Sequence, residues 1–144
     1  MSLEAKRNEY LANLAVLNAK LHNLHWNVKG MQFISVHEYT ESLYDAMFER
    51  FDAVAEELKM EGLFPAASLA EYIKLASVEE LGNKDYTAEE VLAIVKADLE
   101  LMMNLALEIR GLAEEEDNFL VQASMEADVE QYKKNLWFIG SMLA

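Results

Sequence analysis

Residues 10–30, YLANLAVLNAKLHNLHWNVKG, decide the fold class of this chain. Leucine recurs in this stretch at intervals of three and four residues, at Leu11, Leu14, Leu17, Leu21 and Leu24. Because an α-helix turns once in about 3.6 residues, this spacing places the five side chains on one face. The pattern predicts an amphipathic helix from about Leu3 to Val28, closed by Gly30.

The rest of the chain contains signals for three further long helices and a short one. A Ser or Thr followed three residues later by Glu can cap a helix start, and this occurs at Ser35, Ser68 and Thr87. We expect helices at about 36–60, 69–75 and 88–113, and a last one that starts after Asp117 or Asn118 and ends near residue 142. Residues 80–86 are predicted to form a loop.

These segments predict an all-α fold. The single proline and the five glycines leave few chain breaks, which favours long helices. No segment alternates with a period of two for long enough to indicate a sheet. Four long helices, with a short helix between the second and the third, are typical of a four-helix bundle with a long crossover. We expect one domain over residues 1–144.

Composition excludes several classes of protein. The chain has no cysteine, so disulfides, zinc–thiolate sites and cysteine nucleophiles are excluded. No apolar run approaches the ~20 residues of a membrane span, and the N-terminus lacks a secretory signal, so we expect a cytoplasmic protein. The formal net charge of −14 disfavours nucleic acid as a direct partner, because phosphate binding requires clustered Lys and Arg.

Several side chains that can bind a metal ion lie close together in the sequence, all before residue 57. The three histidines are His22, His25 and His37, and the expected second helix adds Glu41, Asp52 and Glu56. His37 and Glu41 are four residues apart, as are Asp52 and Glu56, so each pair shares a helical face. Imidazole and carboxylate without sulfur suit iron or manganese, and zinc is also compatible.

The spacing of the two pairs indicates a site shared between chains. Glu41 and Asp52 are about three helical turns apart, which corresponds to roughly 16 Å along the axis. One metal ion cannot span that distance when its ligands lie at about 2 Å. If both pairs bind the same ion, they come from two copies of the chain packed around a two-fold axis. The predicted site therefore exists only in an oligomer.

Other interpretations of these residues remain open. An in-bundle diiron site of the Glu-x-x-His type is excluded, since the positions three before the histidines are Ala19, His22 and Ile34. Carboxylates four apart on an acidic helix are usually a solvated face, and a histidine beside Trp26 at a helix end is often a packed side chain. The spacing alone supports a metal site and these structural roles equally.

Residues 25–56 contain several short motifs, which are His25-Trp26-x-Val28-x-Gly30, Phe33, His37-Glu38, Leu43-Tyr44-Asp45 and Asp52-x-x-x-Glu56. With these motifs the segment closely resembles the Dps family of miniferritins. Weaker similarity continues through Gly62, Pro65 and Ser68 to Leu136-Trp137, so that the resemblance covers nearly the whole chain. It implies a ferritin-like four-helix bundle, twelve copies of which form a hollow shell.

The resemblance also implies a ferroxidase centre that holds two iron ions at a two-fold interface. By position its metal ligands are His25, His37 and Glu41 of one subunit with Asp52 and Glu56 of the neighbour. Glu41 stands where the family often has Asp, and Glu57 where it commonly has Arg. Trp26 resembles a tryptophan that lies beside the centre and intercepts oxidising equivalents, so it is the predicted catalytic residue.

The implied function is iron oxidation and storage. Such a protein oxidises Fe(II) with hydrogen peroxide or oxygen, stores the ferric product and protects the cell from oxidative damage. The acidic run Glu114–Asp117 is a candidate iron pore or a solvated helix end. One alternative is a DNA-compacting stress protein with secondary iron binding, which the absence of a basic terminal tail disfavours. Another is a helical oligomer without chemistry, in which the histidines are structural.

Overall fold

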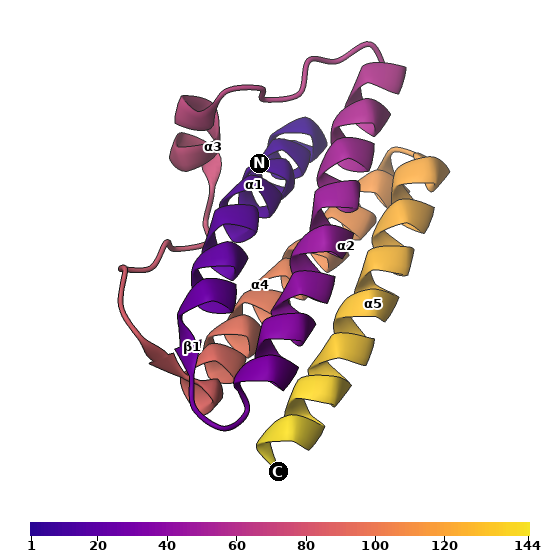
Figure 1. Cartoon of the computed structure of the whole chain (residues 1–144). Coiled ribbons are helices and arrows are strands. Elements are labelled where there is room, and N and C mark those ends of the chain that lie inside the picture. The colour runs from indigo at the N-terminus through magenta and orange to yellow at the C-terminus, as the bar shows by residue number, and fades with distance from the viewer.

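Four long helices and a short one form the structure, a computed structural model that describes all of residues 1–144. They are α1 (Leu3–Asn27), α2 (Phe33–Met60), α3 (Leu69–Leu75), α4 (Ala88–Glu115) and α5 (Phe119–Leu143). Helix α1 packs antiparallel to α2, α4 packs antiparallel to α5, and α1 also contacts α4 (Figure 1). The predicted all-α bundle with a short helix between its second and third long helices is confirmed.

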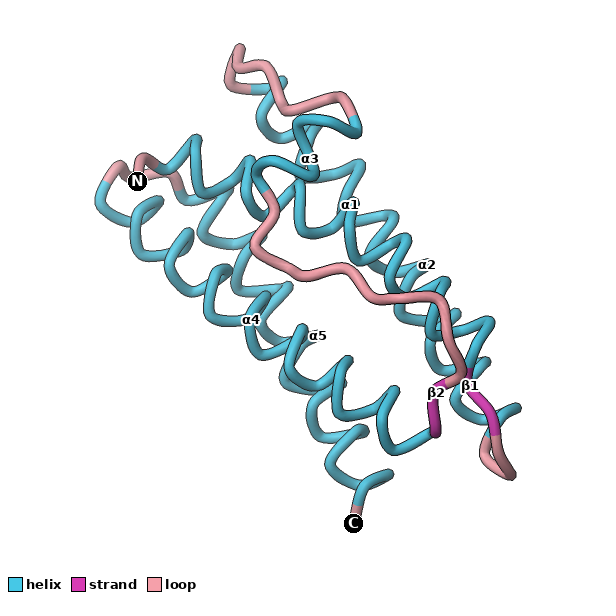
Figure 2. Tube along the Cα trace, turned by 90° about the vertical axis from the view of Figure 1, so that its left-hand side faces the viewer, coloured by secondary structure: helices cyan, strands magenta, loops and turns pink.

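The segment between α2 and α4 runs along the bundle from one end to the other, so that α2 and α4 point in the same direction (Figures 1 and 2). Helix α3 lies on this segment and packs against α1. Buried Asn13 of α1 holds the stretch that follows α3. Its side-chain oxygen accepts the backbone N–H groups of Ser77 at 2.7 Å and Val78 at 3.0 Å. The crossover is therefore anchored by a core amide.

The helix-start signals were only partly correct. Thr87 and Glu90 form the predicted capping box, and the Ser68 and Asn118 side chains cap α3 and α5. The predicted box at Ser35 is wrong, because α2 already begins at Phe33 and has no side-chain cap. Gly30, at φ +119°, reverses the chain there, and its carbonyl accepts the Phe33 N–H at 3.1 Å. This backbone turn starts the helix before Ser35 is reached.

A two-residue parallel pairing joins the ends of two helices. Strand β1 (Val28–Lys29) follows α1 and strand β2 (Tyr86–Thr87) precedes α4, with Val28 opposite Tyr86 (Figure 2). The sequence predicted helix to Val28 and loop through Tyr86, because two residues are too few to show a strand alternation. Both side chains are buried. The pairing therefore fixes the end of α1 next to the start of α4.

The core is apolar and begins with the leucine face of α1. All five leucines that predicted this helix are buried, with at most 1% of their surface exposed. They belong to a continuous cluster of 29 buried side chains to which all four long helices contribute. No helix combines the length and the apolarity that crossing a membrane requires.

A buried polar network joins side chains of α1, α2 and α5. The Tyr10 hydroxyl donates to Asp128 Oδ2 at 2.8 Å and is hydrogen-bonded to the Tyr132 hydroxyl. Arg50 pairs with the same carboxylate, its Nε 2.6 Å from Asp128 Oδ1. Burial raises the pKa of Asp128, against the opposing effect of Arg50 and Tyr10. One carboxylate thus pairs with a guanidinium and accepts a hydrogen bond from a phenol.

We expect Asp128→Ala to lower the free energy of unfolding by about 3 kcal/mol, because it leaves a mostly buried guanidinium without its partner. Urea denaturation measures the change. Glu130→Ala is the matched control, since Glu130 is an exposed acidic residue on the same helix and should change stability by less than about 0.5 kcal/mol. Equal effects of the two substitutions would show that the network contributes nothing specific.

Candidate metal centre

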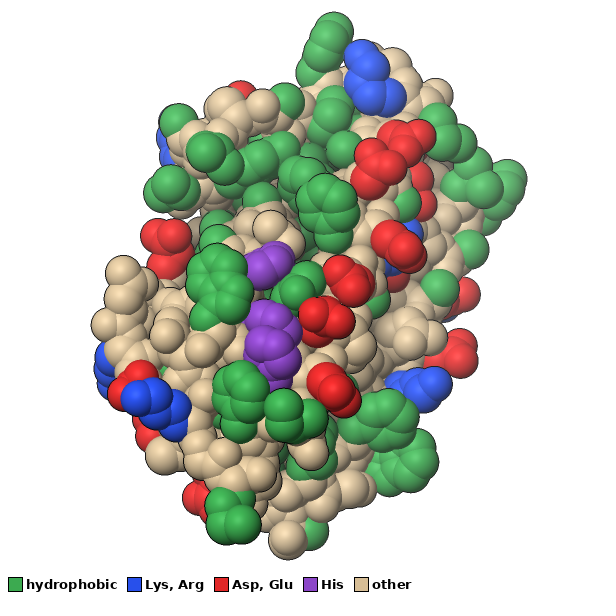
Figure 3. Space-filling model, viewed as in Figure 1, with side chains coloured by type: hydrophobic (Ala, Val, Ile, Leu, Met, Phe, Trp, Pro, Cys, Tyr) green, Lys and Arg blue, Asp and Glu red, His purple; other side chains and the backbone are tan.

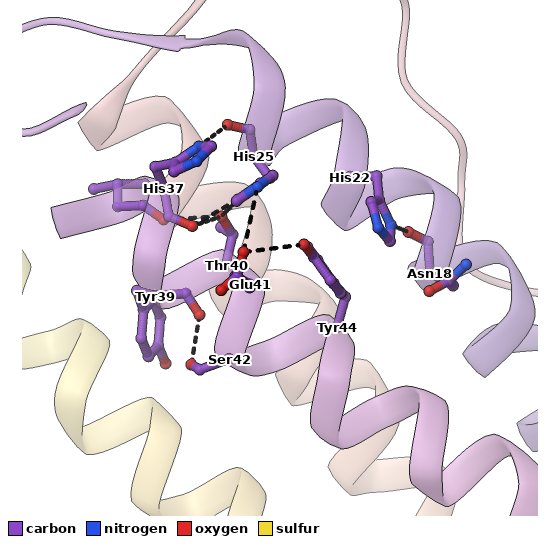
Figure 4. A network of polar contacts seen from close by, with 10 residues as sticks. Asn18, His22, His25, His37, Tyr39, Thr40, Glu41, Ser42 and Tyr44 are labelled. Carbon is purple, nitrogen blue, oxygen red and sulfur yellow. Dashed lines mark hydrogen bonds and ion pairs between the residues drawn. The ribbon is translucent and has the colours of Figure 1, made fainter. Parts of the chain in front are cut away.

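Two histidines from neighbouring helices stack at the junction of α1 and α2. His25 lies near the end of α1 and His37 near the start of α2, with ring centroids 3.6 Å apart and planes 14° apart. Each ring is tied to the backbone of the other residue (Figure 4). Nδ1 of His25 lies 2.6 Å from the His37 carbonyl oxygen, and Nδ1 of His37 lies 2.8 Å from the His25 carbonyl oxygen. The two side chains are therefore held as a unit.

This exchange fixes the positions of the ring protons. A carbonyl oxygen can only accept a hydrogen bond, so each Nδ1 carries the hydrogen. In a neutral imidazole the other nitrogen then has the free lone pair. Nε2 of both His25 and His37 is thereby left as a potential metal ligand. A backbone carbonyl behind the ring is also the contact that commonly orients metal-binding histidines.

Glu41 lies one turn after His37 on α2, and its carboxylate faces His25. Glu41 Oε1 is 3.9 Å from His25 Nε2, which is too long for a hydrogen bond. Two ligand atoms that are each about 2.1 Å from one ion stand at most about 4.2 Å apart. The gap therefore has a size that a shared metal ion can fill. The structure brings the predicted residues His25, His37 and Glu41 together.

Tyr44 and His22 extend this cluster. The Tyr44 hydroxyl donates to Glu41 Oε1 at 3.4 Å, and its ring stacks on His22 with centroids 3.8 Å apart (Figure 4). Desolvation and the carboxylates of Glu41 and Asp45 raise the pKa of Tyr44, so the phenol keeps the proton that it donates. Glu41 thus lies between an imidazole nitrogen and a phenol.

Asp52 and Glu56 form a separate acidic pair further along α2. Both side chains are exposed. A hydrogen bond with Asp52, together with the charge of that residue, raises the pKa of Glu56 above its ordinary value. Neighbouring carboxylates repel one another when both are ionised, and a bound cation removes that repulsion. The pair therefore suits a bound cation.

The two halves of the predicted site do not meet in one chain. Helix α2 is uninterrupted between them, so the separation of Glu41 from Asp52 is roughly 16 Å, as an ideal helix requires. No group of three or more His, Asp or Glu side chains is placed to hold a metal ion. A site that uses all five predicted ligands needs a second copy of the chain.

The surface around the histidines is partly apolar. Figure 3 shows the histidines in a column on this face, with acidic side chains along one side and apolar side chains beside and below them. Among the large apolar residues, Trp26 is 67% exposed and Phe48 is 58% exposed. Contiguous exposed apolar surface is typical of an interface. The face that carries the candidate ligands therefore has the character of a contact surface.

The remaining predicted residues lie near or outside this cluster. The Trp26 ring is 5.5 Å from that of His22, so it borders the cluster at the surface. The acidic run Glu114–Asp117 lies at the turn between α4 and α5, where Asp117 adopts φ +55°. All four of its side chains are exposed, in keeping with either a pore or a solvated helix end.

The sequence analysis assigned no role to Tyr44 and did not include His22 among the ligands of the predicted centre. A signal was present, because Tyr44 follows Glu41 by three residues and His22 precedes His25 by three, and each pair shares a helical face. The stacking of the two rings across α1 and α2 depends on the packing of these helices. No spacing within one helix predicts it.

Comparison with known proteins places the chain in a defined group. A family model described as a ferritin-like domain matches residues 5–144. The chain is 34% identical to Antigen TpF1 of Treponema pallidum over 94% of its own length and 76% of that protein. It is 33% identical to a DNA protection during starvation protein of Brevibacillus brevis, covering 94% and 91% of the two chains. The crystal structure of a Dps protein from Bacillus brevis matches with a TM-score of 0.95 and 30% identity, covering 99% and 95%.

Proposed function

The chain belongs to the Dps family of ferritin-like proteins. We propose that it is an iron-oxidising and iron-storing ferroxidase that assembles as a cytoplasmic dodecamer. Its substrates are Fe(II) and hydrogen peroxide, with oxygen as a second oxidant, and its role is protection from oxidative damage. The observation that carries the proposal is the stacked pair of His25 and His37, whose Nδ1 contacts leave both Nε2 atoms without a backbone partner, with Glu41 3.9 Å from that of His25.

The proposed centre is completed by Asp52 and Glu56 of a second copy. Two ferrous ions held there supply one electron each, and a peroxide molecule takes up both electrons together with two protons to give two water molecules. The chain's contribution is to hold both ions at once, so that the oxygen–oxygen bond is reduced by two electrons without release of hydroxyl radical. Trp26, exposed at the edge of the cluster, is the proposed interceptor of stray oxidising equivalents.

Oxidation of added Fe(II), followed by absorbance under anaerobic conditions with peroxide and separately in air, tests this activity. We expect rapid oxidation in one or both experiments, with ferric product retained by protein of high mass. A protein that leaves the rate of Fe(II) oxidation at that of buffer would exclude the function and favour a helical oligomer without chemistry.

Compaction of DNA is the second candidate, and the net charge of −14 disfavours it. An assembled shell of such chains should repel duplex DNA at neutral pH and low salt, because affinity for phosphate requires clustered positive charge. In a gel shift at stoichiometric protein without divalent ions, we expect free DNA. Retardation that weakens as salt rises would instead indicate a basic patch created by assembly.

A further inference from the structure

The ring of Tyr44 is fixed between two histidines of α1. It stacks on His22 at 3.8 Å, with 21° between the planes, and it meets His25 edge-on at 5.3 Å. His22 is tied to its own helix, because its Nδ1 lies 2.6 Å from the carbonyl oxygen of Asn18. Contacts on both the face and the edge of an aromatic ring favour one rotamer over the others. Tyr44 is therefore a rigid donor on an otherwise open helix face.

The side chain of Glu41 has little else to hold it. It is 55% exposed, and within the chain its only hydrogen bond is the one from the Tyr44 hydroxyl to Oε1. The same oxygen faces His25 Nε2, so the phenol and the imidazole approach it together (Figure 4). Glutamate also has one more rotatable bond than aspartate, and ordering each such bond costs free energy. Without a second contact, this carboxylate would sample positions away from His25.

We propose that Tyr44 is a positioning residue that holds the Glu41 carboxylate beside His25 Nε2, and that His22 holds Tyr44 in turn. The inference rests on the proposed function, since it assigns a role to residues around the proposed iron centre. A neutral donor hydrogen-bonded to a ligand carboxylate restricts the ligand without competing for the ion. The bond is long at 3.4 Å, and such bonds commonly shorten when the ion or substrate is bound.

Binding of Co(II) tests the proposal without any turnover. Tyr44→Phe keeps the ring and its stacking on His22 but removes the hydroxyl. We expect the Co(II) affinity of the assembled protein, measured by calorimetry, to fall by about 10-fold, at the lower end of the effect of losing an outer contact to a ligand. Tyr39→Phe is the matched control, because the Tyr39 hydroxyl on the same helix donates instead to Asn135 Oδ1 at 2.8 Å. Its affinity should match that of the wild type.

A double-mutant cycle separates positioning from a general structural effect. Glu41→Asp draws the carboxylate back from the Tyr44 hydroxyl, so adding Tyr44→Phe in that background should cause no further loss of affinity. His22→Ala should weaken Co(II) binding only while both Tyr44 and Glu41 are present. These non-additive losses would support the proposal, because a substitution that merely loosened the fold would weaken both backgrounds alike.

Two results would overturn the inference while leaving the proposed function standing. One is a wild-type affinity in Tyr44→Phe, and the other is an equal loss on adding Tyr44→Phe to the wild-type protein and to the Glu41→Asp variant. If the wild-type protein bound no Co(II) and oxidised no Fe(II), the proposed centre itself would fail, and the role of Tyr44 with it. Measuring both properties on the same preparation therefore distinguishes the two failures.

Discussion

Replacing both histidines, in His25→Ala with His37→Ala, should slow rapid Fe(II) oxidation by at least about 100-fold. Loss of an outer contact to a ligand commonly costs 10-fold to 100-fold in affinity or activity, and loss of two ligands should cost no less. The variant should keep its helices, because alanine favours a helix at least as well as histidine. Stopped-flow absorbance after mixing with Fe(II) and peroxide measures the rate, and circular dichroism checks the fold.

The acidic half of the site should be equally sensitive. Asp52→Ala with Glu56→Ala removes two exposed side chains, so we expect no loss of stability and the same collapse of the rate. The matched control is Glu126→Ala with Glu130→Ala, which removes two exposed carboxylates at the same spacing on α5, away from the predicted ligands. Wild-type rates in both histidine and acidic variants would show that iron is oxidised elsewhere.

The contact between two copies of the chain can be tested at Phe48. If His37 and Glu41 of one chain meet Glu56 and Asp52 of another across a two-fold axis, that axis crosses α2 between positions 46 and 47. Phe48 lies close to this point on the same face as Glu41, and it is 58% exposed in the single chain. The exposure of this phenylalanine is explained if it packs against α2 of the second copy of the chain.

We therefore expect Phe48→Glu to dissociate the two-fold contact. It places two additional carboxylates close to the axis, and juxtaposed like charges at an interface cost several kcal/mol. Light scattering should show the mass falling from about twelve times 16.4 kDa to smaller species, with Fe(II) oxidation lost and helicity retained. Phe48→Leu, which stays apolar, should keep both mass and activity. A full-sized, active Phe48→Glu protein would contradict the two-fold arrangement.

The sequence was sufficient to predict the helices whose signals are local. The leucine spacing of α1 and the capping box at Thr87 each depend on neighbours within a turn or two. The box at Ser35 failed because the start of α2 is set by the backbone of Gly30, which precedes the apparent cap. A local capping pattern does not predict where a helix begins when a preceding backbone turn supplies the first hydrogen bond of that helix.

Candidate ligands for the site could be proposed from the sequence, but the contacts that support them could not. The sequence spacing alone predicted that the pair containing His37 lies too far along the helix from the pair containing Asp52 to share an ion. The uninterrupted α2 agrees with that distance. The locking of each histidine by the other's carbonyl joins residues twelve apart on two helices, and the stack of His22 on Tyr44 also crosses between helices. Such contacts arise from helix packing, which periodicity does not encode. The same holds for the pairing of Tyr10 with Asp128, 118 positions later.

Mixing the two inactive double variants shows whether one centre is built from two chains. A dimer that contains one chain of each kind has one centre lacking all four substituted side chains and one centre with every ligand present. Co-assembled shells, verified by mass spectrometry, should therefore recover a substantial fraction of the wild-type Fe(II) oxidation rate, although neither variant alone is active. No recovery in verified mixed shells would rule out a centre shared between two chains, because centres built within single chains stay inactive in every mixture.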